Sequence, residues 1–309
     1  MPGASRGCCC TLLLATLLWL HNLKPDSLVC SARSPCRPSG PLGGFVSSTS
    51  DVLGLELLTT GSLRERFTEK NASGGRPVAL HVGPGSFDSK NAFHETFLYY
   101  EVRGSGLTYQ VLFVEPNVQI PLEEHYFFKH VMASHPDWLP TMIHFARAAV
   151  CTSDGLASFY SPGTQLYEQD VLRERDRELA MKALMSFSSL NQSYTSDAIV
   201  AECRHFDFSD RCEALPSYVN ESQVLCLKPA SLFQAAGFTP DALDVLIVDA
   251  QSLTVDVMKL FLALDGLQPV YIKFPHTMAA FEDVAAVAST LASRGYDVHQ
   301  VDDDVRAVL

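Results

Sequence analysis

Residues 77–85 of the chain read PVALHVGPG, and residues 244–252 read DVLIVDAQS. Each stretch is a short, continuously apolar run that stops at a glycine turn or at an acid. Runs of this kind are typical of strands in a parallel sheet, because helices cover both faces of such a sheet and bury every side chain. The two stretches therefore predict central strands, and the rest of the chain can be compared with them.

Similar apolar runs alternate with amphipathic segments along the chain, which predicts an α/β fold with a mostly parallel sheet and helices on both faces. We expect a Rossmann-like scaffold in one domain over residues 51–309, since no internal repeat is visible. Further strands are expected over residues 109–114, 143–150, 157–160, 224–227, 270–274 and 298–301. Helices are expected from Asp51 and over residues 89–100, 121–132, 165–189, 231–236, 255–264 and 279–294.

The N-terminal region indicates the secretory pathway. Residues 8–20 are apolar and follow Arg6, and a run of this length is typical of a signal peptide and short of the ~20 residues that span a bilayer. We therefore interpret residues 1–32 as a signal peptide or a signal anchor, and residues 33–50, rich in Pro, Ser, Gly and Arg, as a linker or stem. Contact with a membrane is expected only through such an anchor.

Three Asn-x-Ser sequons support this location, in the Golgi or endoplasmic reticulum lumen or outside the cell. They place expected glycans on Asn71, Asn191 and Asn220, all in stretches interpreted as loops. Cys203 and Cys212 flank a short polar loop and are expected to form a disulfide in an oxidising compartment.

The spacing of the other cysteines and the overall charge argue against metal binding and nucleic-acid binding. Cys151 and Cys226 lie in apolar, strand-like runs and are interpreted as buried thiols, while the partners of Cys30 and Cys36 stay open. No Cys or His pairs stand at the spacing of zinc ligands, so no metal site is expected. The formal net charge of −12 and the lack of basic runs disfavour nucleic-acid binding.

Candidate binding residues follow the first two predicted strands, at the edge where open α/β sheets bind ligands. Gly83 and Gly85 would let the backbone approach a ligand closely, and Glu115 could accept hydrogen bonds from both hydroxyls of a ribose. A plain turn and a solvated strand end are the structural alternatives. Asp88 stands where pyrophosphate-binding dehydrogenases have a third glycine, and an acid there would repel a diphosphate. A nucleoside ligand is therefore favoured over a nicotinamide dinucleotide.

Motifs at the ends of four predicted strands carry a family resemblance. In chain order they are residues 81–85 (HVGPG), 113–117 (FVEPN), 148–150 (AAV) with 154–155 (DG), and 245–252 (VLIVDAQS). Together they resemble the FkbM family of S-adenosylmethionine-dependent methyltransferases over residues 78–274. The Glu-Pro-Asn triplet is the most specific element.

The resemblance implies a seven-stranded methyltransferase sheet, S-adenosylmethionine as cofactor, and O-methylation of a sugar or another small hydroxylated acceptor. By the same resemblance, Gly83 and Gly85 would face the methionine and ribose moieties, Glu115 would hold the ribose hydroxyls, and Asp249 would lie near the methyl-transfer centre as the catalytic residue. Ser86, directly after the first motif, and Asn117, within the second, complete the expected cofactor-binding set.

The chain also departs from the family pattern. His81 stands where the family has an acid, Gln251 and Ser252 replace a glutamate and a glycine, and Lys273 and His276 follow the fifth strand where the family often has a further acid. His81, His144 and His276 are alternative bases for an acceptor hydroxyl. The departures keep open a second hypothesis, a catalytically silent methyltransferase-fold protein with a binding role in the secretory pathway.

Overall fold

The computed structural model describes residues 49–84, 109–118, 143–168, 172 and 177–309. The expected leader and stem up to residue 48, and the helices expected over residues 89–100 and 121–132, lie outside these residues. Within the described part of the chain, no helix has both the length and the apolar character needed to cross a membrane.

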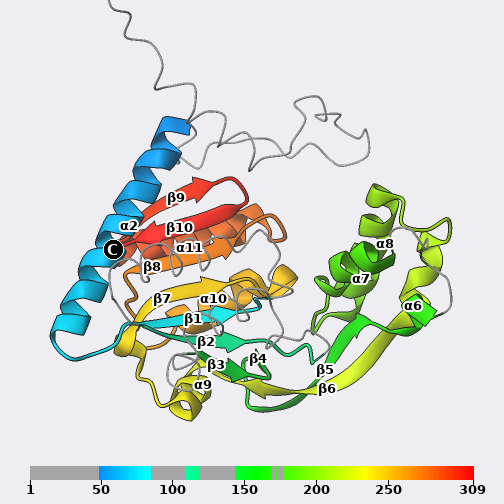
Figure 1. Ribbon diagram of the computed structural model, residues 1–309, viewed down its shortest axis with the longest axis horizontal. Helices are drawn as coiled ribbons and strands as arrows, with labels where there is room; N and C mark the ends of the chain where they lie inside the picture. Colours follow the sequence, from blue (N-terminus) through cyan, green and yellow to red (C-terminus); the bar gives the residue numbers. More distant parts are fainter. Residues whose placement is uncertain (1–48, 85–108, 119–142, 169–171, 173–176) are drawn as a thin grey trace, which may run out of the picture. The chain divides into compact units, whose positions relative to one another are not determined.

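Seven strands form one mixed sheet in the order β3-β2-β1-β7-β8-β10-β9 (Figure 1). The pairs β3–β2, β2–β1, β1–β7 and β7–β8 are parallel, and β10 runs antiparallel to both of its neighbours. The mostly parallel α/β sheet expected from the sequence is therefore present. The strands are β1 (Val78–Val82), β2 (Gln110–Val114), β3 (Ile143–Ala146), β7 (Leu243–Val248), β8 (Tyr271–Pro275), β9 (Asp297–Val301) and β10 (Asp304–Val308).

The chain reverses its direction of travel across the sheet at β1. From β1 it proceeds to β2 and β3 on one side, whereas β7 and β8 extend the sheet on the other side. The crevice at the carboxyl ends of β1 and β7 is thus a topological switch point, the place where open α/β sheets bind ligands.

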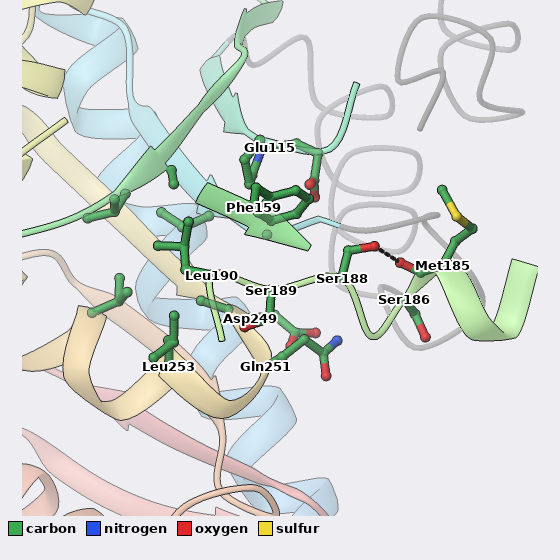
Figure 2. Close-up of a pocket in the computed structure, with 17 residues that line it drawn as sticks. Glu115, Phe159, Met185, Ser186, Ser188, Ser189, Leu190, Asp249, Gln251 and Leu253 are labelled. Carbon is green, nitrogen blue, oxygen red and sulfur yellow. Dashed lines mark hydrogen bonds between the residues drawn. The ribbon is translucent and has the colours of Figure 1, made fainter. Parts of the chain in front are cut away.

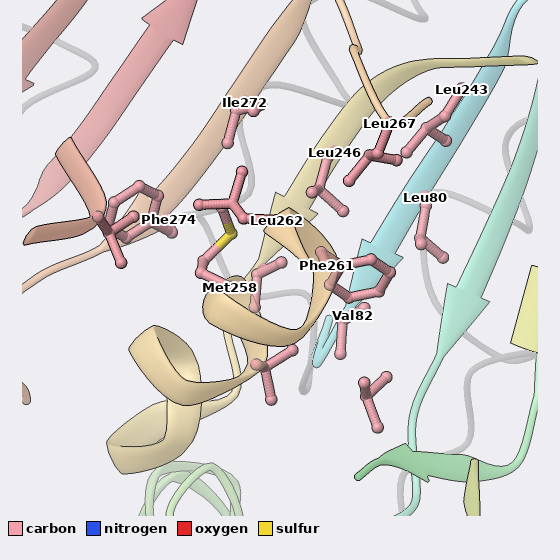
Figure 3. Close-up of a cluster of buried hydrophobic side chains, with 14 of the residues drawn as sticks. Leu80, Val82, Leu243, Leu246, Met258, Phe261, Leu262, Leu267, Ile272 and Phe274 are labelled. Carbon is pink, nitrogen blue, oxygen red and sulfur yellow. The ribbon is translucent and has the colours of Figure 1, made fainter. Parts of the chain in front are cut away.

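Three helices pack against this sheet in one shared core: α9 (Pro229–Ala236), α10 (Thr254–Leu262) and α11 (Phe281–Ser293). Twenty-five buried residues of the described chain form the core between sheet and helices, among them Leu246, Met258, Phe261 and Phe274 (Figure 3). The continuous apolar runs of β1 and β7 are buried along their whole length.

The first described helix, α2 (Thr49–Ala72), is joined to the start of β7 by a buried ion cluster. The Asp244 carboxylate is fully buried and accepts bonds from Arg66 Nε at 3.0 Å and Lys70 Nζ at 2.6 Å. It also accepts the backbone N–H of Val78 at 2.9 Å. The sequence predicted only a short helix from Asp51; the helix has 24 residues because these contacts, and the buried Leu63 and Phe67, hold its later turns.

Residues between β3 and α9 form an inserted region with its own small sheet. Strand β6 (Val219–Leu227) lies between β4 (Ala148–Val150), which is parallel to it, and β5 (Gly155–Pro162), which is antiparallel. The single strand expected over residues 143–150 is therefore wrong. Arg147 separates β3 from β4, and the two strands belong to different sheets.

Helices complete the inserted region. They are α6 (Gln165–Glu168), α7 (Arg177–Met185) and α8 (Gln192–Phe206), followed by a 3₁₀ helix, η5 (Cys212–Tyr218). The continuous helix expected over residues 165–189 is wrong, because Leu172 lies in a bend and α7 ends at Met185. The segment from Ser186 to Leu190 is a turn that leads into α8, with Asn191 as its N-cap.

Two disulfides lie in the inserted region. Cys203 and Cys212 are joined across the loop between α8 and η5, as the sequence predicted. Cys151 and Cys226 are also joined, so their interpretation as buried thiols is wrong. Cys151 follows β4, and its N–H donates to Leu227 O on β6, which brings the two sulfurs together. No local spacing indicated this pair, since 75 residues separate its members.

The chain ends in a hairpin that the sequence did not predict. After β9, residues turn back as β10, which lies between β8 and β9. Lys273 of β8 forms an ion pair with Asp304 at the start of β10, at 3.0 Å. Lys273 stands where the FkbM pattern often has an acid. In this chain its ion pair stabilises the hairpin of β9 and β10.

Two of the three sequon asparagines are not in loops, contrary to expectation. Asn71 lies in the last turn of α2 and Asn220 lies in β6. Asn191 precedes α8 and is exposed.

Candidate functional site

A pocket lies at the switch point, between the carboxyl ends of the main strands and the inserted region (Figure 2). The main sheet contributes the ends of β1, β2 and β7 and the first turns after β7. The inserted region contributes β4, β5 and the turn before α8. The described residues that line the pocket are Val82, Gly83, Glu115, Pro116, Ala149, Val150, Phe159, Met185, Ser186, Ser188, Ser189, Leu190, Asp249, Ala250, Gln251, Leu253 and Val257.

Backbone hydrogen bonds between the carboxyl ends of neighbouring strands place three predicted site residues side by side. Gly83 N donates to Val114 O at 2.8 Å, and Asp249 N donates to Val82 O at 2.8 Å. Glu115 N donates to Ala146 O at 3.0 Å. Gly83, Glu115 and Asp249 therefore meet at one edge of the sheet.

The backbone conformation at position 83 requires a glycine. Its φ is +70°, a left-handed conformation that glycine adopts without strain. A Cβ at this position would lie 2.0 Å from the backbone oxygen of Asp249. The sequence attributed this glycine to a close approach by a ligand, whereas the closest neighbour in the structure is the end of β7.

Glu115 is largely buried, with 5% of its surface exposed. Its Oε1 accepts the backbone N–H of Asn117 at 2.8 Å, which closes the turn after β2. Figure 2 shows its side chain beside the ring of Phe159, which belongs to the inserted region. A carboxylate has about four acceptor positions, so the group is able to accept more than one hydrogen bond.

Asn117 connects the main sheet to the inserted region. Its side-chain amide donates to Ser188 Oγ at 2.9 Å, and its backbone oxygen accepts from Arg147 at 2.9 Å. Asn117 is buried and is not among the residues that line the pocket. The sequence placed it in the cofactor-binding set; in the structure it holds the turn that bears Ser186 and Ser188, which do line the pocket.

Asp249 and Gln251 form the wall after β7, and Tyr194 lies beside them. The Tyr194 hydroxyl donates to Gln251 Oε1 at 3.1 Å. Burial, together with the nearby Asp249 carboxylate, raises the pKa of Tyr194 well above its ordinary value, so the phenol stays protonated. Gln251 has a φ of +53°, a strained value for a residue other than glycine. Tyr194 therefore holds the side-chain amide of Gln251 at the pocket wall through its Oε1 atom.

Of the other candidate residues, the three histidines are not brought to the pocket, and two residues are not described. Gly85 and Ser86 lie outside the described residues. His81 is fully buried within β1, with its ring 5.8 Å from that of Phe113. His144 is exposed on β3, where its ring lies 6.3 Å from Phe238. The Nε2 atom of His276 lies 3.1 Å from Asp302 O, away from the pocket.

The charges and size of the pocket limit what it can hold. Glu115 and Asp249 are the two charged residues among its described lining residues, and both are acidic. A carboxylate pair of this kind suits hydroxyl-rich or cationic groups and disfavours phosphates. The cavity volume is about 70 Å³, within a depression whose empty space, open solvent included, is about 600 Å³. The cavity is therefore below the roughly 300–1,000 Å³ of typical small-molecule pockets.

Apart from Ala149 and Val150, which belong to one of the four motifs, sequence reasoning missed the pocket residues of the inserted region. Phe159 and the turn before α8 had no motif that indicated a site, because ordinary apolar and serine residues become lining residues only through the folding of the insertion. Tyr194 was missed for the same reason, since 57 residues separate it from Gln251. Among the described residues, no group of His, Cys, Asp and Glu could hold a metal ion.

No family model, curated protein or solved structure matches the chain. The resemblance to FkbM methyltransferases thus rests on the four motifs alone. The function has to be argued from the residues of the pocket and from the position of the pocket in the fold.

Proposed function

We propose that the chain binds S-adenosylmethionine at the switch-point pocket and methylates a hydroxyl group of a sugar or another small hydroxylated acceptor in the secretory pathway. The observation that carries the proposal is the meeting of Gly83, Glu115 and Asp249, from three separate strands, at one pocket. The seven-stranded sheet with one antiparallel strand near its edge is in keeping with the methyltransferase scaffold that the resemblance implies.

The acidic residues have separate roles in this proposal. Glu115, at the end of β2, would accept hydrogen bonds from the ribose hydroxyls. Asp249, at the end of β7, would lie nearest the transferred methyl group and the acceptor hydroxyl. Methyl transfer requires chiefly that the reacting groups be positioned, with a base for the hydroxyl proton. The disulfides of the inserted region are compatible with a lumenal or extracellular location.

The proposal is tested by isothermal titration of the purified full chain with S-adenosylmethionine and S-adenosylhomocysteine. The informative variant is Glu115→Gln, since a glutamine oxygen can still accept the Asn117 N–H that Glu115 accepts now. Glu221→Gln is the matched control, because Glu221 is an exposed acid on β6 that contacts Ser158. Binding that is weakened at least tenfold by the first change and is unaffected by the second supports the proposal.

Two observations favour a second candidate, a catalytically silent binding protein on the same scaffold. The cavity is smaller than a typical ligand pocket, and Gln251 takes the place of an acid in the family motif. A folded chain that binds neither S-adenosyl compound would exclude the methyltransferase proposal and favour this second candidate. Binding of the cofactor without methylation of any hydroxylated acceptor would also favour it.

A further inference from the structure

The three sequon asparagines have different surroundings, which bears on their modification. Asn191 is exposed at the start of α8, where its Oδ1 accepts the backbone N–H of Tyr194 at 3.1 Å. This contact uses the side-chain oxygen and does not involve the amide nitrogen. Ser193, the hydroxyl residue of the same sequon, is exposed as well.

The side-chain nitrogen of Asn220, which would carry the sugar, is already in contact with other residues. It is half-buried in β6, and its Nδ2 donates to Gln165 Oε1 at 3.3 Å. The backbone of Gly163 is so close that a Cβ there would lie 2.6 Å from Asn220 Nδ2. A sugar bonded to this nitrogen would displace the chain at Gly163 and the start of α6.

Asn71 is held in a similar way. Its Nδ2 donates to Phe67 O at 2.8 Å within the last turn of α2. The preceding residue, Lys70, forms the ion pair with the buried Asp244. A glycan at this position would crowd the contact that fastens α2 to the sheet.

We propose that Asn191 is the sequon that carries an N-linked glycan and that Asn71 and Asn220 remain unmodified in the folded protein. In this reaction the Asn191 amide nitrogen bonds to the anomeric carbon of an oligosaccharide carried on a polyprenyl diphosphate. The bond between that carbon and the diphosphate breaks, the diphosphate leaves with the bonding electron pair, and the amide loses one proton.

The glycan would stand at the edge of the switch-point pocket. Asn191 directly follows Ser189 and Leu190, two lining residues that Figure 2 shows in the pocket, and its N–H donates to Ser189 Oγ at 3.2 Å. The inference depends on passage through the secretory pathway and is independent of whether the pocket binds S-adenosylmethionine.

The test is expression of the full chain in secreting eukaryotic cells, followed by enzymatic deglycosylation that converts a glycosylated asparagine to aspartate. Peptide mass spectrometry then identifies the modified site. The informative variant is Ser193→Ala, which destroys the sequon and keeps the Asn191 cap of α8. Ser73→Ala and Ser222→Ala are the matched controls for the other two sequons.

We expect wild type to show one deglycosylation step, with aspartate at position 191, which is lost in Ser193→Ala and kept in both controls. A modified Asn71 or Asn220, or an unmodified Asn191 in the secreted wild type, would overturn the inference. The peptide measurement on wild type decides the matter even if a variant fails to fold.

Discussion

The main sheet and the inserted region are held together by different means. The main sheet has a large apolar core and a buried ion cluster around Asp244. The inserted region has two small clusters, with nine and four buried residues in the described chain, and it contains both disulfides. Cys203 and Cys212 belong to the larger of these clusters, and Cys226 belongs to the smaller one.

This difference indicates how each region obtains its stability. A small cluster buries too little apolar surface to offset the entropy lost on folding, and cross-links that restrict the unfolded chain are the usual remedy. The pocket combines both regions, because the main sheet supplies the acids and the inserted region supplies Phe159 and the serine turn. The shape of the pocket should therefore depend on the oxidised state of the inserted region.

The largest effect is expected when the Cys151–Cys226 disulfide is removed by the double change Cys151→Ala and Cys226→Ala. The chain-entropy relation for a loop of 75 residues gives a loss of about 4.5 kcal/mol. The disulfide packs in the same cluster as Ala149 and Phe159, so the pocket wall should loosen with it. Hydrogen exchange of β4, β5 and β6 would measure the effect.

The matched control is Cys203→Ala with Cys212→Ala. Its loop of nine residues predicts a smaller loss of about 2.5 kcal/mol, and its cluster is separate from the pocket-lining Phe159. Exchange that rises equally along β5 in both double variants would contradict the division between the two clusters.

Asp244→Asn should produce a large single-residue effect in the main sheet. It removes the buried charge that Lys70 and Arg66 neutralise, and because both cations are partly exposed and stay hydrated, the expected loss is that of charge-assisted hydrogen bonds, about 2 kcal/mol. Denaturant unfolding measures the loss, and faster hydrogen exchange in α2 would locate it. Asp249→Asn is the control at the other end of β7, with an expected change in stability below about 1 kcal/mol. Equal losses would mean that Asp249 is a structural residue and would weaken its proposed role.

Gly83→Ala tests whether the main sheet tolerates a side chain at the switch point. A left-handed φ costs an alanine about 1 kcal/mol, and the clash with the Asp249 backbone adds to that cost, for a total of about 2 kcal/mol or more. Gly237→Ala is the matched control, since Gly237 has a φ of +73° and open space around its Cβ position. If the two variants unfold at the same denaturant concentration, the ends of β1 and β7 are further apart than the structure indicates.

The main sheet was largely predictable from the sequence. Its strands are continuous apolar runs, and their pattern predicted that Gly83 and Glu115 lie at the carboxyl ends of neighbouring strands, while the family resemblance added Asp249. The exception was the hairpin of β9 and β10, because Asp302, at a φ of +52°, marks its turn without a glycine.

The inserted region was mostly unpredictable, for physical reasons. Residues 143–150 are apolar throughout, and nothing in that pattern shows that the chain changes sheets at Arg147. The helical pattern over residues 165–189 continues past Met185, where tertiary packing ends the helix and turns Ser188 toward Asn117. Non-local contacts of this kind, and the Cys151–Cys226 pair, are decided by the assembled fold.

The smallest effect is expected from Ser188→Ala, which removes one of the hydrogen bonds between the two regions. Ser188 Oγ accepts from Asn117 Nδ2 and donates to Met185 O at 2.8 Å. The bond to Met185 O lies within the turn, as the Ser186 bond to Ala183 O does. A single hydrogen bond contributes about 1 kcal/mol, so Ser188→Ala should lower the free energy of unfolding by about that much more than Ser186→Ala does. Ser186→Ala is the matched control, because the Ser186 hydroxyl bonds only within its own turn, to Ala183 O. Hydrogen exchange at Asn117 that rises in the first variant alone would show that this bond couples the acidic edge of the main sheet to the inserted region, whereas equal exchange in both would assign that coupling to Arg147.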